Sequence, residues 1–584
     1  MQHQPAAEGD HMVDLSKRPF YLSEEKIRWV EDTISSMTFD EKVGQLFINL
    51  TLRRDPQYIT ELCEKYHIGG VRWQGGRLEE VYEQNRLFQE KSKVPVLIAA
   101  NCEAGGNGAV GEGTMVATGA ACAASTTTQT IRDMARVGGR EAATVGCNWT
   151  FAPVCDVVSN WRNTIVNTRA YGNDPDQIIE LSKAYMEEMK AEGLACAAKH
   201  FPGDGSEERD QHLIMGCNDL TTEEWDASYG KVYQALIDAD LPSIMVGHIC
   251  QPAYTRYFNP GIEDKDIKPA TLQPELLQNL LREKMGFNGL LVTDASHMAG
   301  LTAGASRADV VPGVIAAGCD MLLFFNDPDE DIAYMKAGIA DGRISEERLS
   351  DALHRILGLK AMLGLDQLVF PDKESLSVVG CAEHHEAAAR AADESITLVK
   401  DTQHVLPLDP SKKRVLLYYV ESAPVSLADG PDKGKQIMIE ELEAAGFTVT
   451  APKDYYELEM EGASPFNRFR MMAHHSMEEF KKNYDLVLVV LAMQGYAQAN
   501  NVRVTYSVGH SSEIPWSVHE IPTIGISLNY TNHLYDVPML KTFINAYAPK
   551  KEYIHALVEK LTGKSPFKGQ ANELVWCGRW ETRL

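Results

Sequence analysis

The chain has 584 residues, and 82 acidic against 56 basic residues give it a formal net charge of −26. This excess argues against nucleic acid or an anionic membrane as the main partner, because both bind clustered lysine and arginine. With 44% hydrophobic and 24% charged residues, the composition is that of a globular protein, and its length suits two to four domains of roughly 100–200 residues each.

The amino-terminal sequence and the cysteines predict a cytoplasmic protein. Met1 to Asp10 has no basic stretch followed by an apolar one, so we expect no secretory signal. The longest apolar run, Leu486 to Met493, is shorter than the roughly 20 residues that cross a bilayer. The 11 cysteines are odd in number and lack a Cys-x-x-Cys pair, which favours reduced, buried thiols over disulfides or a zinc site.

Short apolar runs alternate with amphipathic stretches over the first 365 residues. The runs are Val43–Leu50, Ile68–Trp73, Val94–Asn101, Cys147–Val157, Leu194–Phe201, Leu241–Ile249, Asn288–Ser296 and Cys319–Asn326. Helical patterns lie between them at Leu78–Lys91, Thr127–Ala143, Asp176–Glu192 and Pro274–Met285. Runs that are apolar throughout are typical of strands buried on both faces of a parallel sheet. Eight such units predict a (β/α)8 barrel, and an open doubly wound sheet is the alternative.

Polar side chains gather where these runs end. They are Asn101, Glu103, Asp156, Lys199, His200, His248, Asp294 and Asn326. In a barrel the carboxyl ends of the strands converge on one face, where active sites form, whereas in an open sheet they spread along an edge. So many ionisable groups at these positions favour the barrel.

A second α/β region follows a helix predicted over Ser345–Gly364. Its strands are expected at Arg414–Val420, Phe447–Ala451, Tyr484–Met493 and Ile521–Leu528, with helices at Lys433–Ala445 and Lys550–Leu561. We therefore predict a barrel over residues 1–365, a linker over 366–384 and a smaller α/β sandwich over 385–584.

The segment from Lys199 to His212 is dense in ionisable groups and contains turn residues, which suits a loop that approaches a ligand. Asp210 and His212 are two positions apart, so in an extended loop their side chains point the same way. A neighbouring carboxylate favours the protonated imidazole, which makes a general acid. Glu207 or Glu208 is the alternative proton donor, and an exposed loop of solvated charges is the structural alternative.

Asp294 stands directly after a strand-like run. A carboxylate in this position can be a nucleophile, a metal ligand or a helix cap, and capping is the usual role of Asp at such a junction. The residues alone leave the three roles open.

Several segments occur together in a recognisable order. They are Met37–Phe47, Phe151–Val157, Arg169–Pro175, Lys199–Gly203, Val292–Asp294, Ser395–Lys400 and Leu406–Leu408. Together they make the sequence resemble glycoside hydrolase family 3, most closely its β-N-acetylglucosaminidase branch. The resemblance implies a (β/α)8 barrel followed by an α/β sandwich, and an enzyme that retains the configuration of the sugar.

The resemblance also implies a role for individual residues. Asp294 would be the nucleophile and His212, paired with Asp210, the acid/base. The residues that would bind the sugar are Arg169, Lys199 and His200, with Asn101 and Glu103 in place of a carboxylate that usually ends the third strand. A cation such as Lys199 should also keep Asp294 ionised.

Three departures from the family pattern stand out. Asp204 replaces a histidine that the family usually has in this loop, and it adds a negative charge there. Asn101 replaces the usual aspartate, and an amide accepts hydrogen bonds through one oxygen only. An arginine often found a few residues later is missing near Asn107.

The resemblance implies an exo-acting retaining β-N-acetylglucosaminidase that acts on small glycans, such as peptidoglycan or chitin fragments, with neither metal nor organic cofactor. Alternatives are a β-glucosidase or another β-glycosidase of the family, a phosphorylase, and a sugar-binding protein without activity. A small glycan is the expected partner, nucleic acid and membrane are not expected, and a homodimer is left open, with the second domain as a scaffold or dimer surface.

Overall fold

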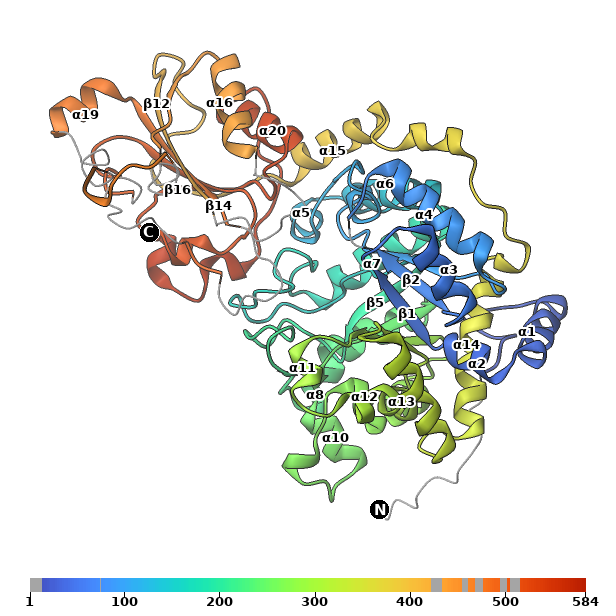
Figure 1. Ribbon diagram of the computed structural model, residues 1–584. Coiled ribbons are helices and arrows are strands. Elements are labelled where there is room, and N and C mark those ends of the chain that lie inside the picture. The colour runs from blue at the N-terminus through green and yellow to red at the C-terminus, as the bar shows by residue number, and fades with distance from the viewer. Residues whose placement is uncertain are drawn as a thin grey trace.

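The computed structural model describes residues 13–73, 75–421, 433–453, 461–467, 476–493, 502–504 and 515–584. The amino-terminal residues on which the signal-peptide prediction rests, Met1 to Asp10, lie outside the described residues. The chain forms a closed barrel and a second, separate sheet (Figure 1). The predicted barrel is therefore confirmed, and the open sheet is excluded.

Eight parallel strands close the barrel in the order β1-β10-β9-β7-β5-β4-β3-β2. They are β1 (Phe47–Thr51), β2 (Gly70–Trp73), β3 (Leu97–Ala100), β4 (Trp149–Thr150), β5 (Ala195–Phe201), β7 (Ser243–Val246), β9 (Leu290–Ala295) and β10 (Met321–Leu323). The main helices of this part are α1 (Glu24–Ser36), α2 (Phe39–Gly44), α3 (Pro56–Glu64), α4 (Leu78–Lys91), α5 (Gly119–Ala124), α6 (Gln129–Thr144), α7 (Pro175–Ala191), α8 (Thr222–Trp225), α9 (Lys231–Ile237), α10 (Pro252–Phe258), η5 (Glu275–Lys284), α11 (Ala299–Thr302), α12 (Arg307–Ala317), α13 (Pro328–Ala340) and α14 (Glu346–Met362). Each predicted apolar run supplies one barrel strand.

The strands are shorter than the apolar runs that predict them. Val43 belongs to α2, whose amino terminus is closed by a capping box between Thr38 and Glu41, so β1 begins only at Phe47. Within Cys147–Val157 only two residues pair as β4. Apolarity reports burial, and both helix ends and irregular segments beside a barrel are buried as well.

The predicted helix over Ser345–Gly364 is confirmed as α14. The Ser345 hydroxyl accepts the backbone N–H of Arg348 as an N-cap. Gly364, with a φ of 74°, adopts the left-handed conformation just past the helix end.

The second sheet has six strands in the order β11-β16-β15-β14-β12-β13. They are β11 (Thr397–Asp401), β12 (Arg414–Glu421), β13 (Thr448–Thr450), β14 (Leu486–Ala492), β15 (Thr523–Ser527) and β16 (Thr542–Asn545). β11 runs antiparallel to β16, and the other pairs are parallel. The helices of this part include α16 (Gly434–Ala444), α19 (Met477–Asn483) and α20 (Lys551–Leu561). The predicted elements are found here, together with the two strands β11 and β16 that the pattern did not indicate.

Helix α15 (Ala382–Ser395) joins the two parts and packs against α5 and α6 on one side and α20 on the other (Figure 1). The expected linker, residues 366–384, holds short 3-10 turns and the first residues of α15. Two tyrosines of the second part reach barrel loops. The Tyr530 hydroxyl donates to the carbonyl of Thr164 at 2.6 Å, and that of Tyr553 donates to the carbonyl of Val116 at 2.8 Å.

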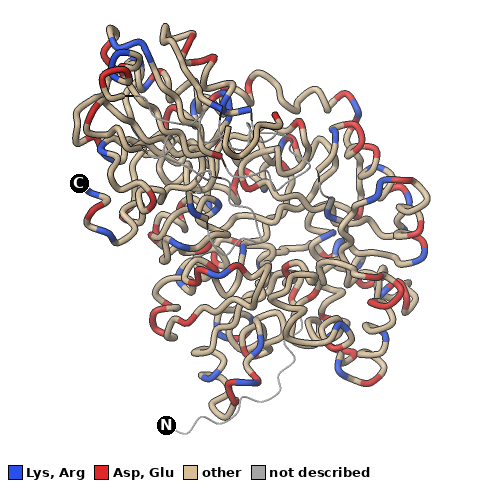
Figure 2. Tube along the Cα trace, turned by 60° about the vertical axis from the view of Figure 1, so that its left-hand side comes forward, with Lys and Arg blue, Asp and Glu red and all other residues tan. Residues whose placement is uncertain are grey.

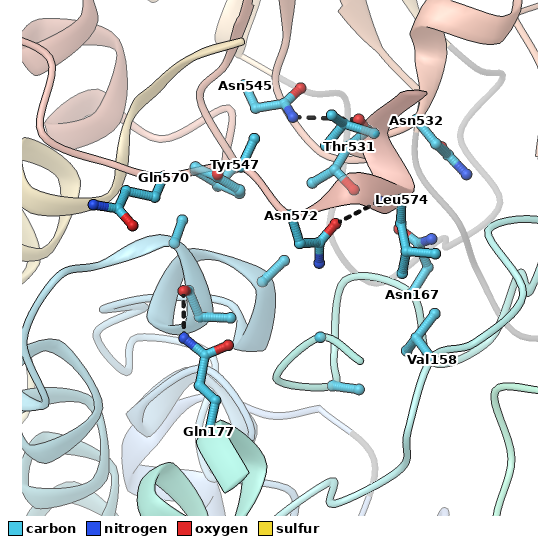
Figure 3. Close-up of a pocket in the computed structure, with 17 residues that line it drawn as sticks. Val158, Asn167, Gln177, Thr531, Asn532, Asn545, Tyr547, Gln570, Asn572 and Leu574 are labelled. Atoms are coloured by element: carbon cyan, nitrogen blue, oxygen red, sulfur yellow. Dashed lines mark hydrogen bonds between the residues drawn. The ribbon is translucent and has the colours of Figure 1, made fainter. Parts of the chain in front are cut away.

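A small pocket of about 50 Å³ lies between the two parts and is lined mainly by amide and small side chains (Figure 3). The Oδ1 atoms of Asn167 and Asn545 are buried there with no hydrogen-bond partner in the described structure. A polar cavity of this size suits ordered water. None of the predicted site residues lines it.

Acidic and basic positions are interspersed along the chain (Figure 2). Among the described helices, none combines the length and the apolar character that crossing a membrane requires. Nine of the cysteines are buried, as expected, and Cys217 and Cys381 are partly exposed.

Candidate active site

Asp294 is the penultimate residue of β9 and is partly exposed. Its Oδ1 accepts the backbone N–H of Ala295 at 2.7 Å. Burial alone raises the pKa of this carboxyl, but the imidazoles of His200, His248 and His212 outweigh it, so the pKa is lowered to about 2. Asp294 is therefore a carboxylate at neutral pH. Its side chain does not cap the following helix α11, which begins at Ala299 with no side-chain cap.

Asp210 and His212 form the predicted pair. The His212 Nδ1 atom lies 2.7 Å from Oδ1 of Asp210, and the same oxygen accepts the His212 backbone N–H at 2.8 Å. Asp210 is fully buried, while 24% of the His212 side chain is exposed. Because the carboxylate occupies Nδ1, the ring presents Nε2 for proton transfer.

The loop that carries His212 is held by the segment that follows Asp294. The carbonyls of Gln211 and His212 accept the backbone N–H groups of Gly300 and Ala299, at 3.1 and 3.0 Å. These donors belong to the first turn of α11, whose amide groups have no partner within the helix. The two predicted catalytic segments are thus joined through main-chain hydrogen bonds.

The alternative donors Glu207 and Glu208 are less suited to the acid role. Glu207 accepts two hydrogen bonds from the Arg209 guanidinium, at 3.0 and 2.7 Å. Burial raises the pKa of Glu207, but the hydrogen bonds and charge of Arg209 lower it by more. The net pKa is therefore lowered, and the carboxylate form is favoured. Glu208 is half exposed and lies 3.9 Å from Arg162.

Glu103, Arg169 and Lys199 form a charge cluster in which Lys199 is buried and the other two are partly buried. Arg169 donates to both Glu103 oxygens, from Nε at 2.7 Å and from Nη2 at 2.8 Å, and Lys199 Nζ lies 2.6 Å from Oε1. Burial opposes ionisation, but the two cations hold the pKa of Glu103 well below its usual range. Glu103 therefore fixes two cations that face Asp294. Lys199 is expected to keep Asp294 ionised, but the imidazoles contribute more.

Asp156 orients His200. Its Oδ2 lies 2.8 Å from His200 Nδ1, and its oxygens also accept the backbone N–H groups of His200 and Asp204. His200 is thus left with Nε2 for a ligand. Asp204 is itself buried, and its Oδ1 accepts the Asn163 amide and the Gly205 N–H, each at 2.7 Å. Burial first, and then the charge of Asp156, raise the pKa of Asp204 to about 8.

Asn101 follows β3, and its Oδ1 atom is buried with no hydrogen-bond partner in the described structure. An unpaired amide oxygen at the carboxyl end of a barrel strand suits a sugar hydroxyl, which would donate to it. The position therefore keeps the acceptor of the usual aspartate but loses its charge.

Arg72 and His248 complete the site. Arg72, on β2, was not predicted; it interacts electrostatically with Glu103, Asp294 and Arg169, and burial lowers its pKa. The sequence signal that could have indicated Arg72 was its position as a cation inside the apolar run Ile68–Trp73. His248 is buried, with Nε2 3.0 Å from the carbonyl of Ala295 and Nδ1 3.1 Å from Thr271 Oγ1. Burial lowers the pKa of His248, the charge of Asp294 opposes that shift, and the ring supports the backbone beside the nucleophile.

The predicted residues that lie around Asp294 are His200, His212, Lys199 and Arg169, with Glu103, Asp156 and Asp210 behind them. Asn326 contacts helix α13 instead: its backbone N–H donates to the Asp331 carboxylate. Within the described residues, no three His, Cys, Asp or Glu side chains are grouped so as to hold a metal ion. The site combines one ionised carboxylate with an oriented imidazole and fixed cations.

The chain is similar to several known proteins of one family. The family model described as "Glycosyl hydrolase family 3 N terminal domain" matches residues 38–359. A "Beta-N-acetylglucosaminidase/beta-glucosidase" of Cellulomonas fimi is 40% identical over 98% of this chain and 100% of its own length. A solved "Beta-glucoside phosphorylase BglX" is 35% identical with a TM-score of 0.88, covering 97% of this chain and 99% of that one. A family 3 β-N-acetylglucosaminidase from Paenibacillus sp. str. FPU-7 shares the fold, with a TM-score of 0.76 at 23% identity over 92% of this chain and 98% of that one.

Proposed function

The chain belongs to glycosyl hydrolase family 3, and we propose that it removes terminal β-linked N-acetylglucosamine from small glycans, such as fragments of peptidoglycan or chitin, with retention of configuration. The observation that carries this proposal is the Asp210–His212 pair joined to the ionised Asp294. A retaining glycosidase needs an anionic nucleophile behind the anomeric carbon and a proton donor at the leaving oxygen.

In the first step the Asp294 carboxylate attacks the anomeric carbon, and His212 Nε2 gives its proton to the departing glycosidic oxygen. The bond to the leaving group breaks as the bond to Asp294 forms, which yields a covalent glycosyl-enzyme. Asp210 stabilises the imidazolium that donates and keeps its ring in place. The pKa of Asp294, lowered to about 2, keeps the nucleophile charged at neutral pH.

In the second step an acceptor molecule attacks the anomeric carbon on the face opposite its bond to Asp294. His212, now neutral, takes a proton from that molecule as it attacks. Water as the acceptor gives the free sugar and restores Asp294. Two inversions at one carbon leave its configuration unchanged.

The sugar itself would be held by the cations and by Asn101. Arg169 and Lys199 are kept in place by Glu103, and His200 by Asp156, so their donors are oriented before the sugar arrives. The charges on these donors suit hydroxyl and acetamido oxygens, which accept hydrogen bonds. Glu103 and Asp156, which hold these donors without contacting the sugar, would act as positioning residues.

The relative from Cellulomonas fimi carries a name with two sugars, glucose and N-acetylglucosamine. Comparing an aryl β-N-acetylglucosaminide with an aryl β-glucoside decides between them: the proposal expects the higher kcat/KM for the former. Asp294→Asn should abolish turnover of both. Turnover by Asp294→Asn equal to that of the wild type would refute the assignment.

A second candidate is phosphorolysis, in which inorganic phosphate replaces water as the acceptor. Two observations support it: the 35% identical solved structure is titled a phosphorylase, and the acid/base is an imidazole. A neutral imidazole repels an incoming phosphate less than a carboxylate would, and Arg169 and Lys199 attract it. Formation of a sugar 1-phosphate, with a rate that rises with phosphate, identifies this reaction; a rate and product independent of phosphate identify hydrolysis.

A further inference from the structure

Two cysteines lie side by side next to the loop that carries His212. The short strands β6 (Gly216–Cys217) and β8 (Ile249–Cys250) form a separate parallel pair, in which Cys217 and Cys250 are direct Cα partners. Adjacent strands lie about 4.7–4.9 Å apart, which falls within the Cα separation of about 4.4–6.8 Å that a disulfide requires.

The two thiols already interact. The Cys250 thiol donates a hydrogen bond to the Cys217 sulfur, which lowers the pKa of Cys217 below its ordinary value; Arg209 lowers it too, while burial, Asp219 and Glu207 oppose. The same bond, with burial, raises the pKa of Cys250. Cys217 is partly exposed, whereas Cys250 is buried. This arrangement pairs an accessible, nucleophilic sulfur with a second thiol that can resolve it.

The other described cysteines differ. For Cys63, Cys122, Cys155, Cys196, Cys319 and Cys577 the pKa is raised, chiefly by burial, which leaves inert thiols. Cys381 is partly exposed but has no cysteine as a strand partner in the described sheets. Reactivity toward oxidants is thus concentrated at Cys217.

We propose that Cys217 and Cys250 are a modification site, at which a peroxide converts the two thiols into a reversible disulfide that restrains the acid/base loop. The Cys217 thiolate attacks one peroxide oxygen, so an S–O bond forms, the O–O bond breaks and the released hydroxide becomes water. The Cys250 sulfur then attacks the Cys217 sulfur; an S–S bond forms, the S–O bond breaks and a second water leaves. Two electrons pass from the two sulfurs to the peroxide. A dithiol then reduces the bridge to the two thiols by thiol–disulfide exchange and is itself oxidised to a disulfide.

The bridge would affect both the loop that carries His212 and the backbone beside the nucleophile Asp294. β6 begins four residues after His212, and Gly216 donates its N–H to the carbonyl of His248, at 3.1 Å. His248 in turn contacts the carbonyl of Ala295, next to the nucleophile. A disulfide needs Cβ atoms about 3.8 Å apart, closer than neighbouring strands normally hold them, so closing it draws β6 toward β8. Because a displacement of about 1 Å can cost 10²-fold in rate, we expect the bridged form to be at least about tenfold slower.

The bridge itself is tested by mass spectrometry on the full chain. The protein is treated with hydrogen peroxide, free thiols are alkylated, and the digest is searched for linked peptides. We expect a Cys217–Cys250 peptide pair that dithiothreitol removes, in the wild type and in Cys381→Ser alike. Cys217 recovered as a sulfinic acid, or alkylated while Cys250 is also alkylated, would overturn the proposal.

The effect on the loop is tested by activity, and only this arm rests on the proposed function. Peroxide should lower the kcat for an aryl β-glycoside at least about tenfold, dithiothreitol should restore it, and Cys217→Ser and Cys250→Ala should keep their activity in peroxide. A bridged protein with full activity, or equal inactivation of the two variants, would refute the restraint. An untreated wild type without any turnover would instead contradict the proposed function and leave the mass result standing.

Discussion

The Nδ1 atom of His212 lies 2.7 Å from Oδ1 of Asp210, an oxygen that also accepts the backbone N–H of His212 at 2.8 Å. One buried carboxylate oxygen of Asp210 thus fixes both the ring and the main chain of His212, two positions later in the chain. This double contact removes rotational freedom from the imidazole before any substrate binds. This contact orients His212 so that its Nε2 atom can donate a proton in one fixed direction.

If His212 is the acid, its removal should matter most when the leaving group needs a proton. His212→Ala should lower kcat/KM by about 10²–10⁴ for a glycoside with a sugar leaving group, and by much less for a nitrophenyl glycoside. Glu208→Gln, in the same loop but half exposed, is the matched control and should keep the wild-type rate for both substrates. An equal loss on both substrates in His212→Ala would show that the residue does not act as the acid.

Glu103 should act on substrate binding through the cations that it holds. Glu103→Gln keeps the size of the side chain but removes the charge that pairs with Arg169 and Lys199, at 2.7 and 2.6 Å. We expect KM to rise at least about tenfold and the melting temperature to fall, because the buried Lys199 would lose its carboxylate partner, and a buried charge without a partner is strongly destabilising. Kinetics below the new melting temperature separate the two effects. Glu80→Gln, which removes an exposed partner of Arg54, is the control. An unchanged KM in Glu103→Gln would contradict this role.

Asp204 should make stability depend on pH. Its pKa is raised to about 8 by burial and by Asp156, so between the unfolded value of about 4 and pH 8 the folded protein binds more protons than the unfolded chain. Stability contributed by Asp204 is therefore fully present below about pH 4 and is lost progressively as the pH rises from about 4 to about 8. Asp204→Asn keeps the oxygen that accepts the Asn163 and Gly205 hydrogen bonds but cannot ionise.

Thermal unfolding of Asp204→Asn and the wild type at two pH values checks this. The variant should match the wild type near pH 4 and exceed its melting temperature near pH 8.5. The same difference between the two proteins at both pH values would mean that Asp204 does not titrate in this range.

The parallel strands of the barrel were predictable because each is buried on both faces and so appears as a continuous apolar run. Closure was not visible in those runs, because it depends on the pairing of β1 with β10, which are far apart in the sequence. It was predicted from the polar residues at the strand ends and from the family resemblance. The strands β11 and β16 escaped prediction because four or five residues of mixed polarity resemble a loop.

The sequence indicated individual members of the candidate site where a motif carried them, as for Asp294 and His212. Its internal contacts were not. Glu103 and Arg169 are 66 positions apart, and nothing in their spacing indicates a shared ion pair. Arg72 was missed for a related reason: a lone cation in a strand gains meaning only when the barrel brings Glu103 and Asp294 opposite it.

The central claim is that Asp294 forms a bond to the sugar, and trapping that bond tests it most directly. An activated 2-deoxy-2-fluoro glycoside slows the second step, so the glycosyl-enzyme accumulates and its mass can be read in the intact protein and in peptides. The account predicts one added sugar, located at Asp294, and no addition in Asp294→Asn. An adduct on another residue, or steady turnover of the reagent with no adduct at any time, would contradict it.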